Sequence, residues 1–324
     1  LLAVPVQPVA GNSHDYTTAD LDNKTNFGKL LEPGLRKIFF ETYDELPEQY
    51  SKVYNVEKVE GAEVKEWGMG AFTDWTKRAD HFDEVAYQTL SPGLERRYVH
   101  EAFTSGFHIT REMFEDQMYR QMEKFPQALA RAGRAKVEKD AMKPFLEGFT
   151  VNGYDGVPLF SNAHPLLDST KLGKNLATGE LNEENLKKAL QLMRETLDEA
   201  GNLMQLSTKR LIIPPALEDV AVRTLKSEKI PGGSLNDTNK FLNAFGIEIC
   251  VLDYLGLAAG GSDTHWFLQD AMRHELNFFW RTKPEFKAEE VFDNFVQKYR
   301  GYMRYSFGYS DWRGLIGSTG VTTP

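Results

Sequence analysis

The sequence predicts an α+β protein in which long, extended elements flank a compact α/β region. Three observations predict this class. Residues Lys298–Tyr309 alternate in polarity with period two, as a strand with one buried and one solvated face does. Apolar side chains recur at helical spacing from Thr110 to about Leu146. Residues 1–108, by contrast, contain few apolar side chains, so they have little with which to build a core of their own.

Composition limits the class of protein. With 324 residues, 41% hydrophobic and 26% charged, the chain can bury a sizeable core and is neither disordered nor a membrane protein. No apolar run approaches the roughly 20 residues that span a bilayer. A net charge of -9 argues against a dedicated nucleic-acid-binding surface, which is normally basic. That charge is compatible with a protein that encloses nucleic acid without gripping it.

The ends and the single cysteine add two expectations. The opening residues lack the basic region of a signal peptide, and the missing initiating Met suggests processing or a start outside this sequence. Cys250 is the only cysteine, so neither an internal disulfide nor a cysteine metal cluster can form, which fits a reducing compartment. Cys250 lies in the apolar run 247–252, and we expect an inert thiol in a buried strand.

The elements of the first part of the chain follow in order. Residues 1–26 predict an extended arm, and Gly28–Tyr43 predicts a short helix that is interrupted near Pro33. Residues 45–108 contain four strand-like pieces: Val53–Val59, Glu63–Trp67, Val85–Thr89 and Arg96–Phe103. This region is either a flexible surface loop or a hairpin that becomes ordered on a neighbouring subunit. The second reading implies that the scarce apolar residues find their partners on other chains.

The rest of the chain predicts longer elements. Thr110 is a suitable N-cap for a helix over 110–147, with a kink near Pro126 and a length of about 50 Å. Asn182 caps a second helix over 182–199. A further helix begins at Pro214-Pro215. Buried strands are predicted at Leu211–Ile213, Ile247–Leu252, Trp266–Gln269 and Leu276–Trp280. The last strand is Val291–Tyr309, followed by a closing turn to Gly320.

The sequence contains no constellation that predicts catalysis, cofactor binding or a metal site. No nucleophile elbow, Walker A loop or H-E-x-x-H helix is present, and Gly68-Met-Gly70 lacks the third glycine of a dinucleotide site. His164 lies near Asp168 and His265 near Asp263, but a metal needs three or four ligands. We therefore expect His164 to shape the turn before Pro165. The protein is predicted not to be an enzyme.

Basic and aromatic residues are interleaved near the C-terminus. They are Lys298, Tyr299, Arg300, Tyr302, Arg304 and Tyr305. Such a pattern can form a stacking platform for nucleic acid. The alternative is a strand whose basic face pairs with acidic neighbours across a subunit boundary. The excess of acidic residues favours the subunit contact.

Several segments together resemble a known family. The segments are Leu211–Val220 with Leu225-Lys-Ser227, Asp253-Tyr-Leu255, Trp266–Asp270, and Val291–Val296 followed by Arg304, Gly308 and Asp311-Trp-Arg313. With the order of elements over nearly the whole chain, they resemble the tailed-bacteriophage major capsid proteins of the HK97 fold. Within that family the chain is similar to the Mu-like major head branch.

The resemblance implies a layout of the chain: an N-terminal arm at 1–44, an extended E-loop at 45–108, a P-domain at 109–205 and 275–324, and a compact A-domain at 206–274. It implies no catalytic, cofactor-binding or metal-binding residues. Some relatives join an E-loop lysine covalently to a P-domain asparagine. Lys58, Lys65 and Lys77 are available here, and Asn294 occupies a similar place, but no acidic catalyst can be assigned, so we do not expect a cross-link.

The resemblance also implies the function. Many copies, arranged as pentamers and hexamers, would form an icosahedral head that encloses double-stranded DNA without reading its sequence. Portal, scaffold and decoration proteins would be further partners, and the membrane would not be involved. The protein would reside in the virion after assembly in the host cytoplasm. Two alternatives stay open: an encapsulin-like bacterial compartment, which shares this fold, and a soluble enzyme without a recognised motif.

Overall fold

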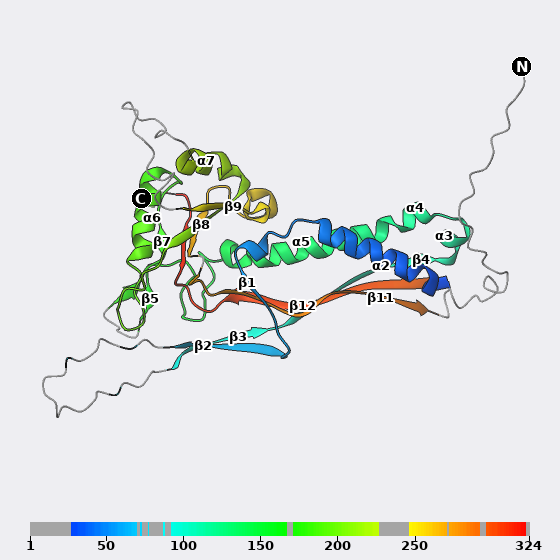
Figure 1. Cartoon of the computed structure of the whole chain (residues 1–324), viewed down its shortest axis with the longest axis horizontal. Coiled ribbons are helices and arrows are strands. Elements are labelled where there is room, and N and C mark those ends of the chain that lie inside the picture. Colours follow the sequence, from blue (N-terminus) through cyan, green and yellow to red (C-terminus); the bar gives the residue numbers. More distant parts are fainter. Residues whose placement is uncertain are drawn as a thin grey trace, which may run out of the picture. The chain divides into compact units, whose positions relative to one another are not determined.

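The computed structural model describes residues 27–69, 72, 77, 87, 92–166, 171–226, 246–270, 272–291 and 296–321 (Figure 1). The chain divides into two compact units. The smaller unit takes in the chain up to Glu45, Ser105–Ala130 and Phe286–Gly301, and the larger unit takes in the remainder. Four elements belong in part to each unit: β4 (Glu101–Thr110), α5 (Lys124–Leu146), β11 (Leu276–Val291) and β12 (Val296–Tyr309). The mixed α+β class is as predicted.

Two long strands dominate the four-stranded sheet, whose order is β1-β11-β12-β4. Strand β11 has 16 residues and β12 has 14. Because only residues 292–295 separate them, they run antiparallel, since a parallel pair needs a much longer crossover. The Ser310 N–H donates to the Glu275 carbonyl (2.9 Å). Eleven residues further along each strand, Phe286 stacks on Tyr299 with ring centroids 5.7 Å apart. One register therefore accounts for both contacts.

The predicted ends of these strands were wrong. Strand β11 continues to Val291, well beyond the predicted end at Trp280, and β12 begins at Val296, so only the first residue of the strand predicted over Val291–Tyr309 belongs to β11. The polar sequence after Trp280 contains Pro284, a residue that usually ends a strand, and the predicted strand therefore stopped too early. Strand β1 (Asn55–Lys58) pairs in parallel with β11 only over Asn277–Trp280. Pro284 lies beyond that pairing, where its missing N–H interrupts no ladder with β1.

The period-two alternation of β12 is largely confirmed. Tyr299 and Tyr305 are buried, while Lys298 and Arg300 are exposed. Towards the C-terminal end the alternation fails, because Ser306 and Gly308 are buried as well. The side chains that cover them come from the segment before β4. The His100 Nδ1 lies 2.9 Å from the Ser306 Oγ, and a Cβ on Gly308 would lie 3.0 Å from the Tyr98 ring.

The single helix predicted over 110–147 is three helices: α3 (Arg111–Glu115), α4 (Tyr119–Met122) and α5. Thr110 is the N-cap, as expected, and accepts from the Met113 N–H (3.4 Å). Helix α3 ends in a Schellman motif. Gln117 has a positive φ of 54°, and the Met118 N–H donates to the Met113 carbonyl (3.0 Å). No glycine marks this stop, so the sequence did not reveal it. Pro126 lies in the first turn of α5, where proline is tolerated, rather than at a kink.

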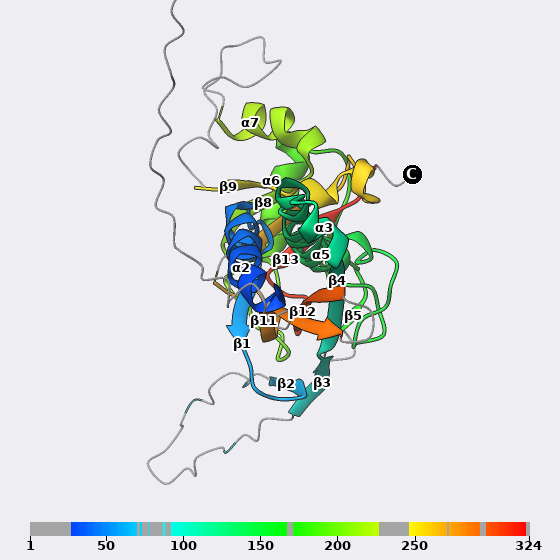
Figure 2. The same ribbon diagram turned by 90° about the vertical axis from the view of Figure 1, so that its right-hand side faces the viewer.

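Helix α2 (Phe27–Glu45) contains Pro33 and is continuous, contrary to the predicted interruption. Its buried side chains Leu35, Phe39 and Tyr43 form one face of the core of the smaller unit. The ring of Phe39 stacks on Phe286 of β11 at 5.2 Å. This packing offsets the missing hydrogen bond at Pro33. Figure 2 shows α2 beside β11, and the first turns of α5 join the same core through Leu129 and Ala130.

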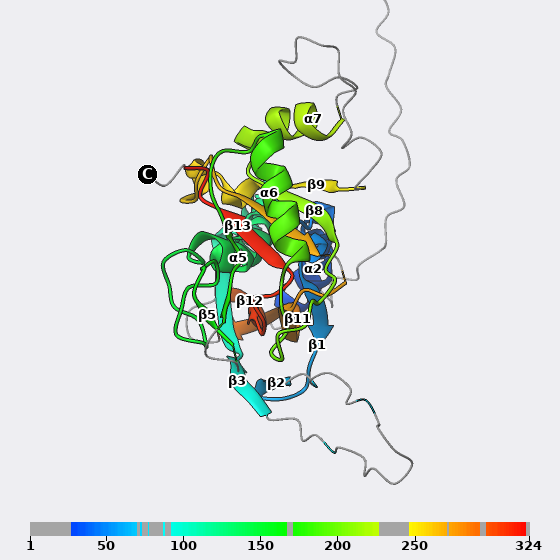
Figure 3. The same ribbon diagram turned by 90° about the vertical axis from the view of Figure 1, so that its left-hand side faces the viewer.

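The larger unit contains a five-stranded sheet in the order β7-β13-β10-β8-β9. These strands are β7 (Leu176–Ala177), β8 (Thr208–Ile213), β9 (Glu248–Val251), β10 (Trp266–Asp270) and β13 (Leu315–Ser318). One face packs on α6 (Glu183–Arg194) and α7 (Glu218–Lys226), which Figure 3 shows beside the strands. The other face, with Ile212, Cys250 and Phe267, packs on Phe145 of α5 in the main core. Both faces are thus buried, as the apolar strand sequences predict.

Short elements complete the larger unit. They are the 3-10 helices η1 (Tyr50–Lys52), η2 (Pro215–Leu217), η3 (Asp253–Leu255) and η4 (Leu257–Ala259), the hairpin strands β2 (Glu63–Met69) and β3 (Pro92–Val99), and the pair β5 (His164–Pro165) and β6 (Leu172–Gly173). Asn182 caps α6 by accepting from the Asn185 N–H (2.8 Å). Helix α6 ends at Arg194 instead of the predicted 199. Beyond it, the Asp198 carboxylate accepts from the Ala200 and Asn202 N–H groups and holds a turn.

The segment after β12 is not merely a closing turn. Strand β13 pairs antiparallel with β10 and parallel with β7, so the C-terminal residues complete the five-stranded sheet. The prediction missed this strand because it is short and glycine-containing. Gly317 in it faces the ring of Phe160, and a Cβ there would lie 2.6 Å from that ring.

The expectation that residues 1–108 find their apolar partners on other chains is also wrong in part. Tyr50, Val53 and Tyr54 are buried in the main core of the larger unit. The Glu138 carboxylate of α5 accepts from the Gln49 N–H (2.9 Å) and the Tyr50 N–H (3.0 Å), which holds the start of η1. These apolar residues of the region therefore belong to the core of their own chain.

We predict that Gly106→Ala destabilises the smaller unit by about 1–3 kcal/mol, because a Cβ at this position of β4 would lie 2.4 Å from the Tyr299 carbonyl oxygen. Urea unfolding of the two proteins measures the difference. Gly34→Ala is the matched control on α2, where nothing lies within 4 Å of the new Cβ. This control should be neutral or stabilising by up to about 1 kcal/mol. Equal stability of the Gly106→Ala variant and the wild type would contradict the close approach.

Candidate intersubunit surface

The β2–β3 hairpin has two chemically different faces. In its antiparallel register Val64 pairs with Tyr98, and Lys65 with Arg97. Side chains of alternate residues point to opposite faces of a strand. Val64, Glu66 and Tyr98 therefore share one face, the inner face. Glu63, Lys65, Trp67, Glu95, Arg97 and Val99 share the other, the outer face.

The inner face is attached to the start of β11. Tyr98 is buried and packs edge-on against Phe279, with ring centroids 5.1 Å apart. Asn277 donates from its amide to both oxygens of Glu66 (3.2 and 3.0 Å), and the Ser310 hydroxyl also donates to Glu66. Burial raises the pKa of the Glu66 carboxyl, and the nearby Glu275 and Glu57 charges raise it further. A half-buried carboxylate thus links the hairpin to the main body of the larger unit.

The outer face is exposed and neutral. Arg97 pairs with Glu63, and Lys65 lies 3.5 Å from Glu95 and 3.6 Å from Glu63. These charges satisfy one another within the hairpin. Trp67 and Val99 are both 57% exposed. A large exposed aromatic side chain on a hairpin whose charges are already paired is typical of an anchor in a protein contact.

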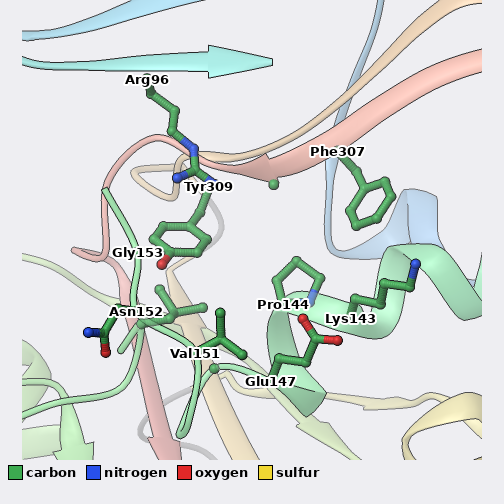
Figure 4. A pocket seen from close by; sticks show the side chains of 12 residues that line it. Arg96, Lys143, Pro144, Glu147, Val151, Asn152, Gly153, Phe307 and Tyr309 are labelled. Atoms are coloured by element: carbon green, nitrogen blue, oxygen red, sulfur yellow. The ribbon is translucent and has the colours of Figure 1, made fainter. Parts of the chain in front are cut away.

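A cavity of about 240 Å³ lies beside the hairpin base. Figure 4 shows Arg96 reaching from β3 toward the ring of Tyr309, while Lys143 projects from α5 and Glu147 from the position just after that helix. The Arg96 guanidinium lies 5.1 Å from the Tyr309 ring centroid, and Lys143 pairs with Asp140 (2.9 Å). Arg96 and Lys143 thus hold structural contacts, and the residues that line the cavity include no nucleophile paired with a base.

A comparison with protein families identifies the chain. The family described as "Phage capsid protein" matches residues 94–318, more than half of the sequence. The chain belongs to the phage capsid protein family. This capsid protein forms the shell of a phage particle by self-association, and its place is the virion. A search of curated proteins found no match.

Solved structures share the fold of the capsid protein at low sequence identity. The capsid of cyanophage P-SCSP1u is 12% identical with a TM-score of 0.53, over 85% of this chain and 88% of that one. A structure of Microbacterium phage Oxtober96 is 8% identical with a TM-score of 0.52, over 86% and 92%. The SrpI encapsulin of Synechococcus elongatus PCC 7942 is 12% identical with a TM-score of 0.51, over 86% and 89%. The HK97-type fold is therefore confirmed.

The residues singled out for chemistry have structural roles. His164 is buried; its Nδ1 lies 2.6 Å from the Asp155 carboxylate and its ring stacks on Trp312 at 4.3 Å. Its sequence neighbour Asp168 lies outside the described residues. Cys250 is buried in β9, and burial raises the pKa of its thiol, as an inert core thiol requires. His265 packs against Phe149 at 4.9 Å.

The described residues contain no group of three or more metal-ligating side chains. None of the helices among them has the length and apolar character needed to cross a bilayer. Of the residues considered for covalent joining, Lys65 is paired within the hairpin, and Asn294 lies outside the described residues.

Two of the three interleaved tyrosines of β12 cannot stack on nucleic acid. Tyr299 and Tyr305 are each 1% exposed and belong to the cores of the smaller and larger unit respectively. Their rings are unavailable to nucleic-acid bases. The opposite face of the strand carries the half-buried Tyr302 together with the basic residues, of which Lys298 and Arg300 are exposed. The basic residues and the two buried tyrosines therefore serve different contacts.

We predict that Glu66→Gln changes the pH dependence of the stability of the capsid protein. The raised pKa of Glu66 means that its ionised form destabilises the fold above that pKa, and that protonation relieves this as the pH falls. The wild type should gain stability relative to the glutamine variant as the pH falls from neutral towards the ordinary pKa range of a glutamate, by less than about 1 kcal/mol because solvent screens a half-exposed carboxylate. Thermal unfolding across that range measures it.

Glu101→Gln is the control for this prediction, because Glu101 is exposed at the start of β4. Its difference from the wild type should stay constant with pH. If Glu66→Gln also shows a constant difference, Glu66 is ionised in both states without penalty, and the account of the hairpin base fails.

Proposed function

We propose that this capsid protein is the major subunit of an icosahedral head that encloses the double-stranded DNA of a tailed phage. The match over residues 94–318 to phage capsid proteins carries the proposal. The acidic net charge of -9 fits a wall that holds DNA without gripping it. Copies would gather as pentamers and hexamers, with portal, scaffold and decoration proteins as further partners, in the cytoplasm of the host. Membership of the Mu-like head branch is part of the proposal.

The proposed domain layout keeps the predicted boundaries, with one addition. Residues 206–274, proposed as the A-domain, supply β8, β9, β10 and α7. Strands β7 and β13 complete the same sheet, so 176–177 and 315–318 belong with that domain. Residues 109–205 and 275–324 otherwise form the proposed P-domain, 45–108 the E-loop and 1–44 the arm.

The E-loop is proposed to lie on an adjacent copy through the outer face of the β2–β3 hairpin. Support comes from the inner face, which is occupied by contacts within the chain, and from the outer face, whose charges are paired and whose Trp67 is exposed. An individually weak contact is sufficient, because a closed symmetric shell repeats it many times.

An encapsulin-like compartment is the second candidate, because the SrpI encapsulin shares the fold at a TM-score of 0.51. Electron microscopy of negatively stained particles, with analysis of nuclease-protected contents, distinguishes the candidates. A phage head contains genomic DNA, whereas a compartment contains a cargo protein. A monodisperse small oligomer without particles would contradict both.

We predict that Trp67→Ser folds normally but assembles poorly, since the side chain is 57% exposed and contributes to no core within the described part of its own chain. Loss of a central aromatic anchor costs about 2 kcal/mol or more per contact. Circular dichroism of the subunit and the yield of particles measure the two effects. Trp67→Phe, which keeps an aromatic ring, should recover most of the yield. Wild-type yield from the serine variant would exclude Trp67 as an anchor.

A further inference from the structure

Two arginines face each other on adjacent strands in the larger unit. The Ser310 N–H bonds to the Glu275 carbonyl (2.9 Å), which sets the register of β12 against β11. Six residues further along each antiparallel strand stand Arg304 and Arg281. They are therefore a directly opposed cross-strand pair, with both side chains on the same face of the sheet. This face is opposite to the one on which Tyr305 stacks with Phe278 in the core.

Like charges directly opposite each other destabilise a pair of strands. Among the described residues, neither arginine forms an ion pair with a carboxylate. Within the same part of the chain, Arg304 makes one hydrogen bond, from its Nε to the His100 carbonyl (3.3 Å). The rest of its guanidinium remains available. The two like charges therefore lie opposite each other without a carboxylate of the described residues at ion-pair distance from either of them.

The pair is accessible from solvent. Both arginines are half-buried, and the neighbouring strand β4 presents Ala102 and Thr104, which are exposed. Strand β4 lies next to β12 in the sheet, so these small side chains leave room for an incoming group beside the Arg304 guanidinium. A guanidinium presents its N–H donors in a planar fork that matches a carboxylate, and two guanidinium groups can hold one carboxylate from both sides.

A buried histidine adjoins the pair. His100 is 4% exposed; its Nδ1 lies 2.9 Å from the Ser306 Oγ, and its buried Nε2 has no hydrogen-bond partner among the described residues. Burial lowers the pKa of His100, and the Arg304 and Arg281 charges lower it further. Both guanidinium charges thus lower the pKa of the same imidazole ring. His100 stays neutral there, which prevents a third positive charge at the site.

We propose that Arg281 and Arg304 together receive a carboxylate side chain from a second copy of this capsid protein. The inference rests on the proposed function, because it requires copies in contact, and it assigns the chemistry of one such contact. A carboxylate between the guanidinium groups removes their repulsion and supplies charge-assisted hydrogen bonds. Assembly then removes the repulsion between Arg281 and Arg304 that remains in the isolated subunit.

A second copy fits better than nucleic acid. The chain carries 47 acidic against 38 basic residues, so each copy has carboxylates in excess. Binding to single-stranded nucleic acid combines cations with exposed aromatic rings, but on the arginine face Tyr302 is half-buried, and the Tyr305 ring lies on the opposite face in the core. The two guanidinium groups would hold one small acceptor between them, which suits a side-chain carboxylate.

Arginine modification of the wild type tests accessibility without any mutation. Phenylglyoxal should modify Arg281 and Arg304 about tenfold more slowly, or slower still, in assembled DNA-free shells than in free subunits. Mass spectrometry of the peptides measures both rates. Equal rates in shells and subunits would overturn the proposal. So would protection that appears only in DNA-filled shells, since the partner would then be nucleic acid.

Carbodiimide coupling then identifies the partner group. Arg281→Lys and Arg304→Lys each place an amine where the guanidinium was, and shells are assembled from equal parts of ¹⁴N- and ¹⁵N-labelled subunits. The expected product is an amide joining the new lysine of one label to an Asp or Glu peptide of the other label. Arg111→Lys is the matched control, because Arg111 pairs with Glu115 of its own helix α3 and should couple only within one label.

The outcomes separate this inference from the proposed function. Shells in which the amines introduced by Arg281→Lys and Arg304→Lys couple to no carboxylate, or only within one label, would overturn the inference and leave the capsid function intact. A wild-type chain that forms no particles would overturn both. Two variants are used so that a folding failure at one position leaves the other as the test.

Discussion

The pairing of β11 with β12 is the interaction on which the rest of this structure depends. These strands supply Phe278, Trp280 and Tyr305 to the core of the larger unit and Phe286 and Tyr299 to the core of the smaller one. A slip of one residue in a strand moves every side chain to the opposite face. Such a slip would expose these rings and bury the intervening arginines and lysines. The alternating polarity of both strands therefore favours one register over its neighbours by a large margin.

The same register presents the two surfaces that we propose for contacts between copies. One end of the strand pair receives the inner face of the β2–β3 hairpin through Tyr98 and Glu66, which leaves the outer face with Trp67 exposed. Further along, it brings Arg281 opposite Arg304. In both places one side of an element packs within the chain and the other side is open to solvent. A protein that works only in many copies can keep such surfaces, because each is covered when the shell closes.

The sequence predicted what depends on local pattern. The buried positions of β12, the N-caps Thr110 and Asn182, and the inert environment of Cys250 follow from spacing and residue type alone. The errors arose where tertiary contacts override local rules. Gln117 ends α3 without a glycine, and Pro33 is held inside α2 by the packing of Phe39. Pro284 lies in β11 beyond the reach of β1, so it interrupts no pairing with that strand.

The opposed arginines could not be found from the sequence, because residues 281 and 304 become neighbours only through the strand register. The most direct test of the account is a cryo-electron microscopy map of the assembled particle with resolved side chains. The account predicts Arg281 opposite Arg304 on adjacent strands, with Phe286 beside Tyr299 on the other face. Strands shifted by one residue, which would place the aromatic rings on the arginine face, would contradict it.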